Sequence, residues 1–537
     1  MLLLISFIAN TLYSSTQYFS EKIQEADAFI SYDSTLYEVN KDGTYTTTYH
    51  ARTKLISQKG IERFGQISFP FSASSGTVAV IYARVYKPGG KKIDISPDNI
   101  KTFRKPAWEG SKEFIPNIYY LKIIFPQLEK GCEIEYRVRD IFRGSAIDNH
   151  FQSYAFFEQT EPIGQKTIIV DAPKTMEIKW ILIENNKSDK KSKMFFHEET
   201  KGERIIKTWS MKEIYPIEAE QAMPYFGNLS SRLLISTLTS WEFLSKWYYE
   251  ISEPTFKSNM DMRFLVNKII SEKMNRIEKI RACFNWVVEN IRYVETTLSG
   301  PKAGLRPDPA PKTFKRQYGV CRDMAALLIS LLSEADIKAW IALTNFTIKT
   351  EKNLPVDQFN HAIVAVKCDT NYIYLDPTPD NSKEFLPAYE YNGQAVLICT
   401  EEGESLRYTP ADKPEKNGLK ITVLSNLNTN NKLTGNMTLE TNGYMDLKLR
   451  NFLKKSTPER TKEFLENLIK NVNSSATIDT FYIEGLSSIK NPLLIKIKYK
   501  VENYGNQMGN ILSLHSPIRN SWEIDNFLRD INPFVLK

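Results

Sequence analysis

The hydrophobic pattern of this chain changes its period twice, which divides the sequence into three parts. Over residues 28–209, short runs such as 78–85 alternate apolar and polar residues, as half-buried strands do. Over residues 240–298 the apolar residues recur at helical spacing, and strand patterns return after residue 401. With 537 residues the chain is also too long for one hydrophobic core. We therefore predict a multidomain protein.

The predicted organisation follows these changes of period. We expect an N-terminal all-β sandwich at residues 21–235, punctuated by turn signals such as Asp42-Gly43. A central α+β domain is expected at residues 236–400, and a C-terminal β-rich domain at residues 401–537.

Three stretches give more specific expectations. Residues 277–291 predict a helix, because Ile277, Ile280, Phe284, Val288 and Ile291 recur at helical spacing. Residues 304–311 contain three prolines and predict an irregular loop. In the C-terminal part we expect one helix, near residues 458–472, between strand patterns.

The first residues predict export from the cytoplasm. Residues 1–9 form a short apolar run, and small polar residues such as Ser14 and Ser15 follow, as in a signal peptide with its cleavage zone. We expect a signal segment at residues 1–20 and a periplasmic or otherwise exported protein. Because the first lysine is Lys22 and the basic start is missing, an ordinary apolar terminus remains the alternative. No later stretch is long and apolar enough for a membrane span.

Charge and metal-binding residue types exclude several classes of function. The net charge of +7 is modest for this length and not concentrated in long basic runs, so we do not expect a nucleic-acid partner. The five cysteines show no C-x-x-C spacing, and an odd number cannot all pair within the chain. The five histidines show no ligand spacing either, so we expect no metal and no cofactor.

One cysteine has the local context of a nucleophile. Cys321 precedes an apolar helical pattern, so its thiol is expected at the helix N-terminus, where the helix dipole lowers a thiol pKa. Gly319 permits close backbone approach, and Asp323 in the first turn is expected to support the dipole. The N–H of Cys321 is a candidate oxyanion donor, with Gln317 and Tyr293 as weaker candidates for a second one.

Two partners for this thiol follow in a predicted hairpin. His361 opens one strand and Asp376 ends the next. If the turn is centred between Cys368 and Asp369, His361 and Asp376 are direct cross-strand neighbours. An imidazole beside the thiol, oriented by a carboxylate, completes a nucleophile, a base and an orienting group. Each residue taken alone is better explained as structural: a small buried cysteine, a strand-end histidine or a turn-forming aspartate.

These residues resemble the transglutaminase-like superfamily. The resemblance rests on residues 318–323 (Tyr-Gly-Val-Cys-Arg-Asp), 359–361 (Phe-Asn-His) and 375–378 (Leu-Asp-Pro-Thr), and on residues 240–249 as the start of the core. It extends over nearly the whole chain, because bacterial exported members join an N-terminal β-rich domain of unassigned role to a papain-like core. Many relatives carry an acidic residue before the cysteine and lysine after it, where this chain has Val320 and Arg322.

The resemblance implies an enzyme in which Cys321, His361 and Asp376 perform acyl transfer. The thiolate would attack a peptide or protein amide, and water or an amine would resolve the thioester. A peptide or protein substrate, including a cell-envelope component, is the expected partner. The alternative from another class is a non-catalytic envelope-binding or scaffold protein that uses its β-rich domains.

Overall fold

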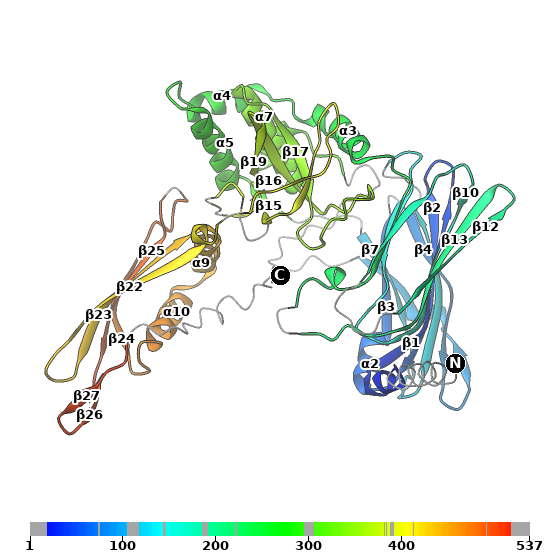
Figure 1. Cartoon of the computed structure of the whole chain (residues 1–537), viewed down its shortest axis with the longest axis horizontal. Coiled ribbons are helices and arrows are strands. Elements are labelled where there is room, and N and C mark those ends of the chain that lie inside the picture. The colour runs from blue at the N-terminus through cyan, green and yellow to red at the C-terminus, as the bar shows by residue number, and fades with distance from the viewer. Residues whose placement is uncertain are drawn as a thin grey trace, which may run out of the picture.

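The computed structural model has three bodies, drawn blue to blue-green, green to yellow-green, and yellow to red in Figure 1. It describes residues 19–73, 76–104, 118–142, 147–184, 192–220, 223–294, 305–380, 382, 384–386, 391–411, 413–489 and 491–516. The predicted multidomain architecture with strand-rich ends is confirmed. The expected signal segment at residues 1–20 lies outside the described residues except for its last two.

The N-terminal domain is a sandwich in which one large sheet packs against two small ones. The large sheet has the order β12-β13-β10-β1-β2-β8-β4-β5. Its strands are β1 (Ala28–Val39), β2 (Tyr45–Leu55), β4 (Gly76–Tyr86), β5 (Lys92–Asp94), β8 (Glu133–Phe142), β10 (Ile163–Pro173), β12 (Met194–Lys201) and β13 (Arg204–Ile214). The small sheets are β3 (Gln66–Ser72), β7 (Ile118–Ile124) and β6 (Ile100–Arg104), and β11 (Lys179–Ile183), β14 (Arg232–Ser236) and β9 (Gln152–Phe156). A short helix, α2 (Gln58–Phe64), follows β2.

Each small sheet closes its own apolar core against the large sheet. Trp209 and Ile168 of the large sheet pack in one cluster with Leu233 of β14. Ile134 packs in a second cluster with Ile123 of β7. The apolar residues of the alternating sequence pattern therefore form the inward faces of the sandwich.

The central domain packs helices on one face of an antiparallel sheet. The helices are α3 (Trp241–Ser252), α4 (Met260–Ile269), α5 (Arg276–Asn290), α6 (Ala310–Arg316) and α7 (Cys321–Glu334). The sheet has the order β19-β18-β17-β20-β21, with β17 (Ala339–Thr344), β18 (His361–Cys368), β19 (Asn371–Leu375), β20 (Ala395–Ile398) and β21 (Arg407–Tyr408). A short parallel pair joins β15 (Arg292–Tyr293) to β16 (Tyr318–Gly319). All residues of α7 from Asp323 to Leu332 are buried, as expected for a helix at the centre of a core.

Two expectations for this domain need correction. The proline-rich stretch 304–311 is not irregular to its end, because α6 begins at Ala310 with Pro311 in its first turn, where a missing N–H costs nothing. The β18–β19 hairpin pairs Cys368 with Asn371, so its turn lies at Asp369 and Thr370 rather than one residue earlier. Asp369 adopts a φ of 52°, a left-handed conformation that aspartate tolerates in turns.

The C-terminal domain is a four-stranded sheet covered by two helices. The sheet order is β22-β23-β25-β24. Its elements are β22 (Gly418–Leu427), β23 (Leu433–Asn442), α9 (Gly443–Lys455), α10 (Pro458–Lys470), β24 (Thr477–Glu484) and β25 (Leu494–Val501), followed by β26 (Asn506–Met508) and β27 (Ile511–Ser513). The helix expected near 458–472 is α10, whereas α9 was not predicted.

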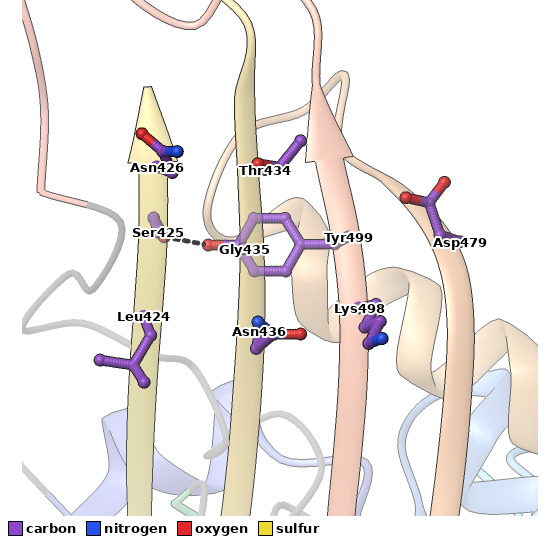
Figure 2. Close-up of a pocket in the computed structure, with 9 residues that line it drawn as sticks. All are labelled: Leu424, Ser425, Asn426, Thr434, Gly435, Asn436, Asp479, Lys498 and Tyr499. Carbon is purple, nitrogen blue, oxygen red and sulfur yellow. Dashed lines mark hydrogen bonds between the residues drawn. The ribbon is translucent and has the colours of Figure 1, made fainter. Parts of the chain in front are cut away.

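One glycine of this sheet makes room for a tyrosine. Figure 2 shows the ring of Tyr499 lying across Gly435, with its hydroxyl hydrogen-bonded to Ser425 at 2.9 Å. A Cβ at position 435 would lie 2.5 Å from the tyrosine ring, so only glycine fits there. The hollow beside this contact has a volume of about 440 Å³.

No helix within the described part of the chain is long and apolar enough to cross a membrane.

Candidate active site

The start of α7 is fixed by a network of polar contacts around Asp323. This carboxylate is buried and accepts hydrogen bonds from the N–H of Val320 at 3.2 Å and the N–H of Asp308 at 2.8 Å. Arg316 donates to it at 2.7 Å. The predicted supporting role of Asp323 thus takes the form of a cap that ties the preceding loop to the first helical turn.

Gly319 lets the backbone just before α7 pack closely against neighbouring side chains. A Cβ at position 319 would lie 3.0 Å from the Cβ of Asp323 and 3.1 Å from Thr313. Both contacts are tighter than ordinary packing, which agrees with the predicted need for glycine just before the cysteine.

Cys321 is the first residue of α7, and its thiol interacts with the ring of His361. Burial raises the pKa of this thiol, but the hydrogen bond and charge of His361, the charge of Arg322 and the N–H of Ala362 together lower the pKa below its usual range. Cys321 is partly exposed, whereas Cys283 and Cys399 are buried and burial raises the pKa of both thiols. All five cysteines are free.

His361 lies between the thiol and a carboxylate. Its Nε2 is 3.3 Å from Oδ2 of Asp376, which leaves Nδ1 as the ring nitrogen for the sulfur. Burial lowers the pKa of His361, but the charge and hydrogen bond of Asp376 and the contact with Cys321 raise it to about 10. The ring also packs against Phe346, with centroids 4.2 Å apart. These contacts favour an imidazolium paired with a thiolate.

Asp376 is fully buried and is held by donors on both oxygens. Oδ1 accepts from the N–H and the hydroxyl of Thr378 at 2.9 and 2.8 Å. Oδ2 accepts from Tyr391 and faces His361. Burial raises the pKa of Asp376, but His361, Tyr391 and Thr378 more than offset this and lower it.

The structure thus brings the three predicted residues together, although not through the expected register. His361 and Asp376 are not directly opposite, because the hairpin register is shifted by two residues and β19 ends at Leu375. A shift by two keeps both side chains on the same face, so the carboxylate still reaches the ring. Their catalytic roles stay a prediction.

Several supporting residues were missed. Thr378 was detectable, because aspartate followed by proline and threonine is a local turn signal in which the carboxylate accepts from the next residues. Tyr391 and Phe346 have no such signal, since each belongs to a distant segment. For the second oxyanion donor, Gln317 is exposed at the end of α6 and Tyr293 pairs with Gly319 in β15–β16. Their proposed role stays a prediction. The described residues contain no group of three metal-ligating side chains.

Two family models match parts of the chain. Residues 263–377 match the transglutaminase-like superfamily, and residues 41–218 match a domain of unknown function with solved structures, DUF3857. A search of curated proteins found no match.

One solved structure of low sequence identity shares the fold of this chain. A "putative protease" from Parabacteroides distasonis is 10% identical with a TM-score of 0.57, and the match covers 89% of this chain and 93% of that one. A "putative cysteine protease" from Cytophaga hutchinsonii is 15% identical with a TM-score of 0.20, covering 47% of this chain and 83% of that one. At such low identity, the similarity to the Parabacteroides structure shows a shared fold and nothing about activity. The similarity to the Cytophaga structure is too low to support a conclusion. The central part of the chain is therefore similar to the transglutaminase-like superfamily, and the N-terminal part to DUF3857.

Proposed function

We propose that this protein is a cysteine-dependent enzyme that hydrolyses or transfers acyl groups of peptide or protein amides. The observation that carries the proposal is the continuous contact from the Cys321 sulfur through the His361 ring to the Asp376 carboxylate. The pKa values of Cys321 and Asp376 are lowered and that of His361 is raised, as a thiolate, a carboxylate and an imidazolium require.

The proposed reaction has two steps with a thioester between them. The Cys321 thiolate attacks the amide carbonyl carbon, the C–N bond breaks, and His361 gives its proton to the leaving amine. Water or a second amine then attacks the thioester carbon, and His361 takes the proton of that nucleophile. The C–S bond breaks and the thiolate returns, with a carboxylic acid or a new amide as product.

Asp376 supports both steps as a positioning residue. Its carboxylate fixes the orientation of the His361 ring and stabilises the imidazolium. The distance of 3.3 Å is long for a charge-assisted hydrogen bond, as is common for catalytic contacts in the unliganded state.

The test is turnover of a library of peptide amides followed by mass spectrometry of the enzyme. We expect product formation, a thioester adduct at Cys321 after rapid acid quench, and loss of both in Cys321→Ala. Cys368→Ala is the matched control, because that thiol is also partly exposed but lies at the far end of β18. Turnover that survives in Cys321→Ala would refute the proposal.

We further propose an exported protein, on the ground of the apolar residues 1–9. Cell fractionation should recover the chain outside the cytoplasm with its first residues removed. Recovery in the cytoplasm with an intact N-terminus would contradict export while leaving the proposed chemistry untouched.

A further inference from the structure

The hollow drawn in Figure 2 lies on the face of the C-terminal sheet opposite to α9 and α10. These helices pack on the other face, in one apolar cluster with Met437 and Ile497. Side chains alternate along a strand, so the adjacent residues Asn436 and Lys498 point the opposite way. Both are exposed. The hollow is therefore open to solvent, and it belongs to a different domain from Cys321.

All strands of this four-stranded sheet contribute to the hollow. Its lining includes Asn426 of β22, Asn436 of β23, Lys498 of β25 and Asp479 of β24 (Figure 2). Asn436 and Lys498 are direct cross-strand neighbours, so their Cβ atoms lie about 4.5–5.5 Å apart. The volume of about 440 Å³ lies within the range of small-molecule sites, roughly 300–1,000 Å³. A small ligand is thus able to contact several of these side chains at once.

Most polar side chains of the hollow are available to a ligand. Among the described residues, the side chains of Asn426, Asn436 and Lys498 have no hydrogen-bond partner within the protein. Thr434 adds a hydroxyl in the same situation. A carboxamide and a hydroxyl both donate and accept hydrogen bonds, and an ammonium group donates them. This set matches a ligand rich in hydroxyl groups, which also donate and accept.

The charge of the hollow is positive because of Lys498. The other two lysines of β25 on this face are neutralised, since Lys496 binds Glu484 at 2.8 Å and Lys500 binds Asp479 at 2.9 Å. Within the described part of the chain, no carboxylate forms an ion pair with Lys498. Asp479 also lines the hollow, but Lys500 compensates its charge. The lining therefore attracts a ligand that carries a negative charge.

The remaining features distinguish between kinds of ligand. Leu424, which is 70% exposed, is the large apolar side chain at the rim, and the other walls are polar, so an apolar ligand is disfavoured. An extended peptide binds by adding a strand to a sheet edge, whereas this hollow lies over the sheet face. Tyr482, 59% exposed, lies opposite Lys496 on the same face and offers an aromatic surface. A sugar ring uses both kinds of surface, because its hydroxyls are polar and its C–H groups are apolar.

We propose that this hollow binds a saccharide that carries an anionic group, with Lys498 contacting the anion and Asn426 and Asn436 contacting hydroxyls. The inference goes beyond the proposed function and does not depend on it. The carboxylate of a uronic acid and the phosphate of a sugar phosphate share the chemistry that Lys498 recognises.

The test begins with binding of the full-length chain, fluorescently labelled, to an array of saccharides. The array carries uronate-bearing and phosphate-bearing saccharides, their methyl-esterified and dephosphorylated counterparts, and polyglutamate. We expect saturable binding to acidic saccharides, with a Kd at least about tenfold lower than for the neutral counterpart, as for one hydrogen bond to a charged group. The uronate and phosphate arms assign the source of the anion.

Variants then locate the site. Lys498→Gln should raise the Kd for the retained saccharide about tenfold or more, and Asn436→Ala should raise it about threefold. Lys420→Gln is the matched control, because it removes the same charge from the same sheet face outside the hollow, where Lys420 pairs with Glu440 at 3.4 Å. Its Kd should equal that of the wild type. Cys321→Ala should also bind normally, which separates this site from the proposed chemistry.

The outcomes that would overturn the inference are distinct. Equal binding to polyglutamate and to acidic saccharides would show general charge attraction rather than a saccharide site. Equal binding to acidic and neutral saccharides would remove the role of the anion. Absence of binding to every saccharide, or an unchanged Kd in Lys498→Gln, would exclude the hollow as the site.

Discussion

At the scale of single residues, the state of Cys321 depends on a competition between burial and positive charge. Burial raises the pKa of this thiol, whereas His361 and Arg322 lower it. Arg322 follows Cys321 directly, and its Nε donates to the carbonyl of Arg306 at 3.3 Å. Its Nη2 is buried without a hydrogen-bond partner among the described residues. The guanidinium therefore acts on the thiol chiefly through its charge.

Replacing Arg322 should make the thiol harder to ionise. In Arg322→Met we expect alkylation of Cys321 at neutral pH to slow by roughly three- to tenfold, as for losing one nearby charge at an effective dielectric of about 20 to 40. Arg322→Lys keeps the charge and should retain most of the rate. The measurement is the iodoacetamide rate at Cys321 as a function of pH. Equal rates in the methionine and lysine variants would show that charge is not the cause.

Among the supporting residues, Tyr391 is the one whose replacement should lower activity most. Tyr391→Phe removes a donor to Asp376 but keeps the ring that packs 5.0 Å from Phe346. We expect kcat/KM on a peptide amide to fall about tenfold or more, in line with the roughly 1.5–3 kcal/mol typical of one hydrogen bond to a charged group. Tyr374→Phe, a buried tyrosine of the same cluster, is the control. Equal effects of the two variants would assign Tyr391 to packing alone.

The sequence predicts that three candidate residues come together, but not the residues that hold them. Cys321, His361 and Asp376 each lie at the end of a helix or strand that local periodicity predicts. Tyr391 reaches Asp376 from a distant segment, and no spacing rule connects the two.

At the scale of elements, the wrong predictions concern the turn between β18 and β19 and the start of helix α9. The β18–β19 register was predicted wrongly by two residues, because the turn at Asp369 carries no glycine to mark it. Helix α9 was missed because it begins at Gly443 directly after β23, and an Asn-Gly pair is a typical turn signal. Long periodic elements such as α5 were predicted to within a residue or two.

A buried ion pair of α9 organises the loop between β24 and β25. Arg450 is fully buried and binds Asp446 through two hydrogen bonds of 3.0 and 3.1 Å. It also donates to backbone carbonyls of the loop, including that of Asn491 at 3.1 Å. Ile489 of the same loop lies in the apolar core of the central domain. The ion pair thus helps to fix the contact between the two domains.

Breaking this pair should destabilise the C-terminal domain strongly. In Arg450→Met the Asp446 carboxylate loses its partner while buried, and we expect a cost of about 3–5 kcal/mol. The double variant Asp446→Leu/Arg450→Met should cost less than Arg450→Met alone, since no unpaired charge remains. Native-state hydrogen exchange of β22–β25 measures this, because it reports on one domain of a larger chain. A double variant less stable than the single one would contradict the account.

At the scale of the whole molecule, the N-terminal domain holds the segment that leads to His361. Arg232 of β14 donates to the carbonyl of Lys349 at 2.8 Å, and Gln152 of β9 accepts from Asp357. Asn228 contacts the same segment through Thr347 and Lys349. The periods of the sequence predicted the three parts, but loop contacts between domains have no period and could not be predicted.

Weakening this contact should loosen the segment without unfolding the domain. In Gln152→Leu the N–H of Asp357 loses its acceptor, so we expect faster hydrogen exchange across residues 349–360. Gln165→Leu, on β10 of the same domain, is the control and should leave that exchange unchanged. Identical exchange in both variants would mean that the N-terminal domain does not restrain the segment.

The central claim is that Cys321 and His361 form a thiolate–imidazolium pair, and the pH dependence of Cys321 alkylation tests it most directly. His361 raises the stability of the thiolate, and its own pKa is raised to about 10, so the pair persists below that pH until the lowered pKa of the thiol is reached. We predict a wild-type rate that stays high as pH falls well below the ordinary thiol range. In His361→Asn only Arg322 and the N–H of Ala362 still oppose burial, so the rate should rise at a higher pH than in the wild type. Overlapping profiles of the two proteins would contradict the pair and the mechanism built on it.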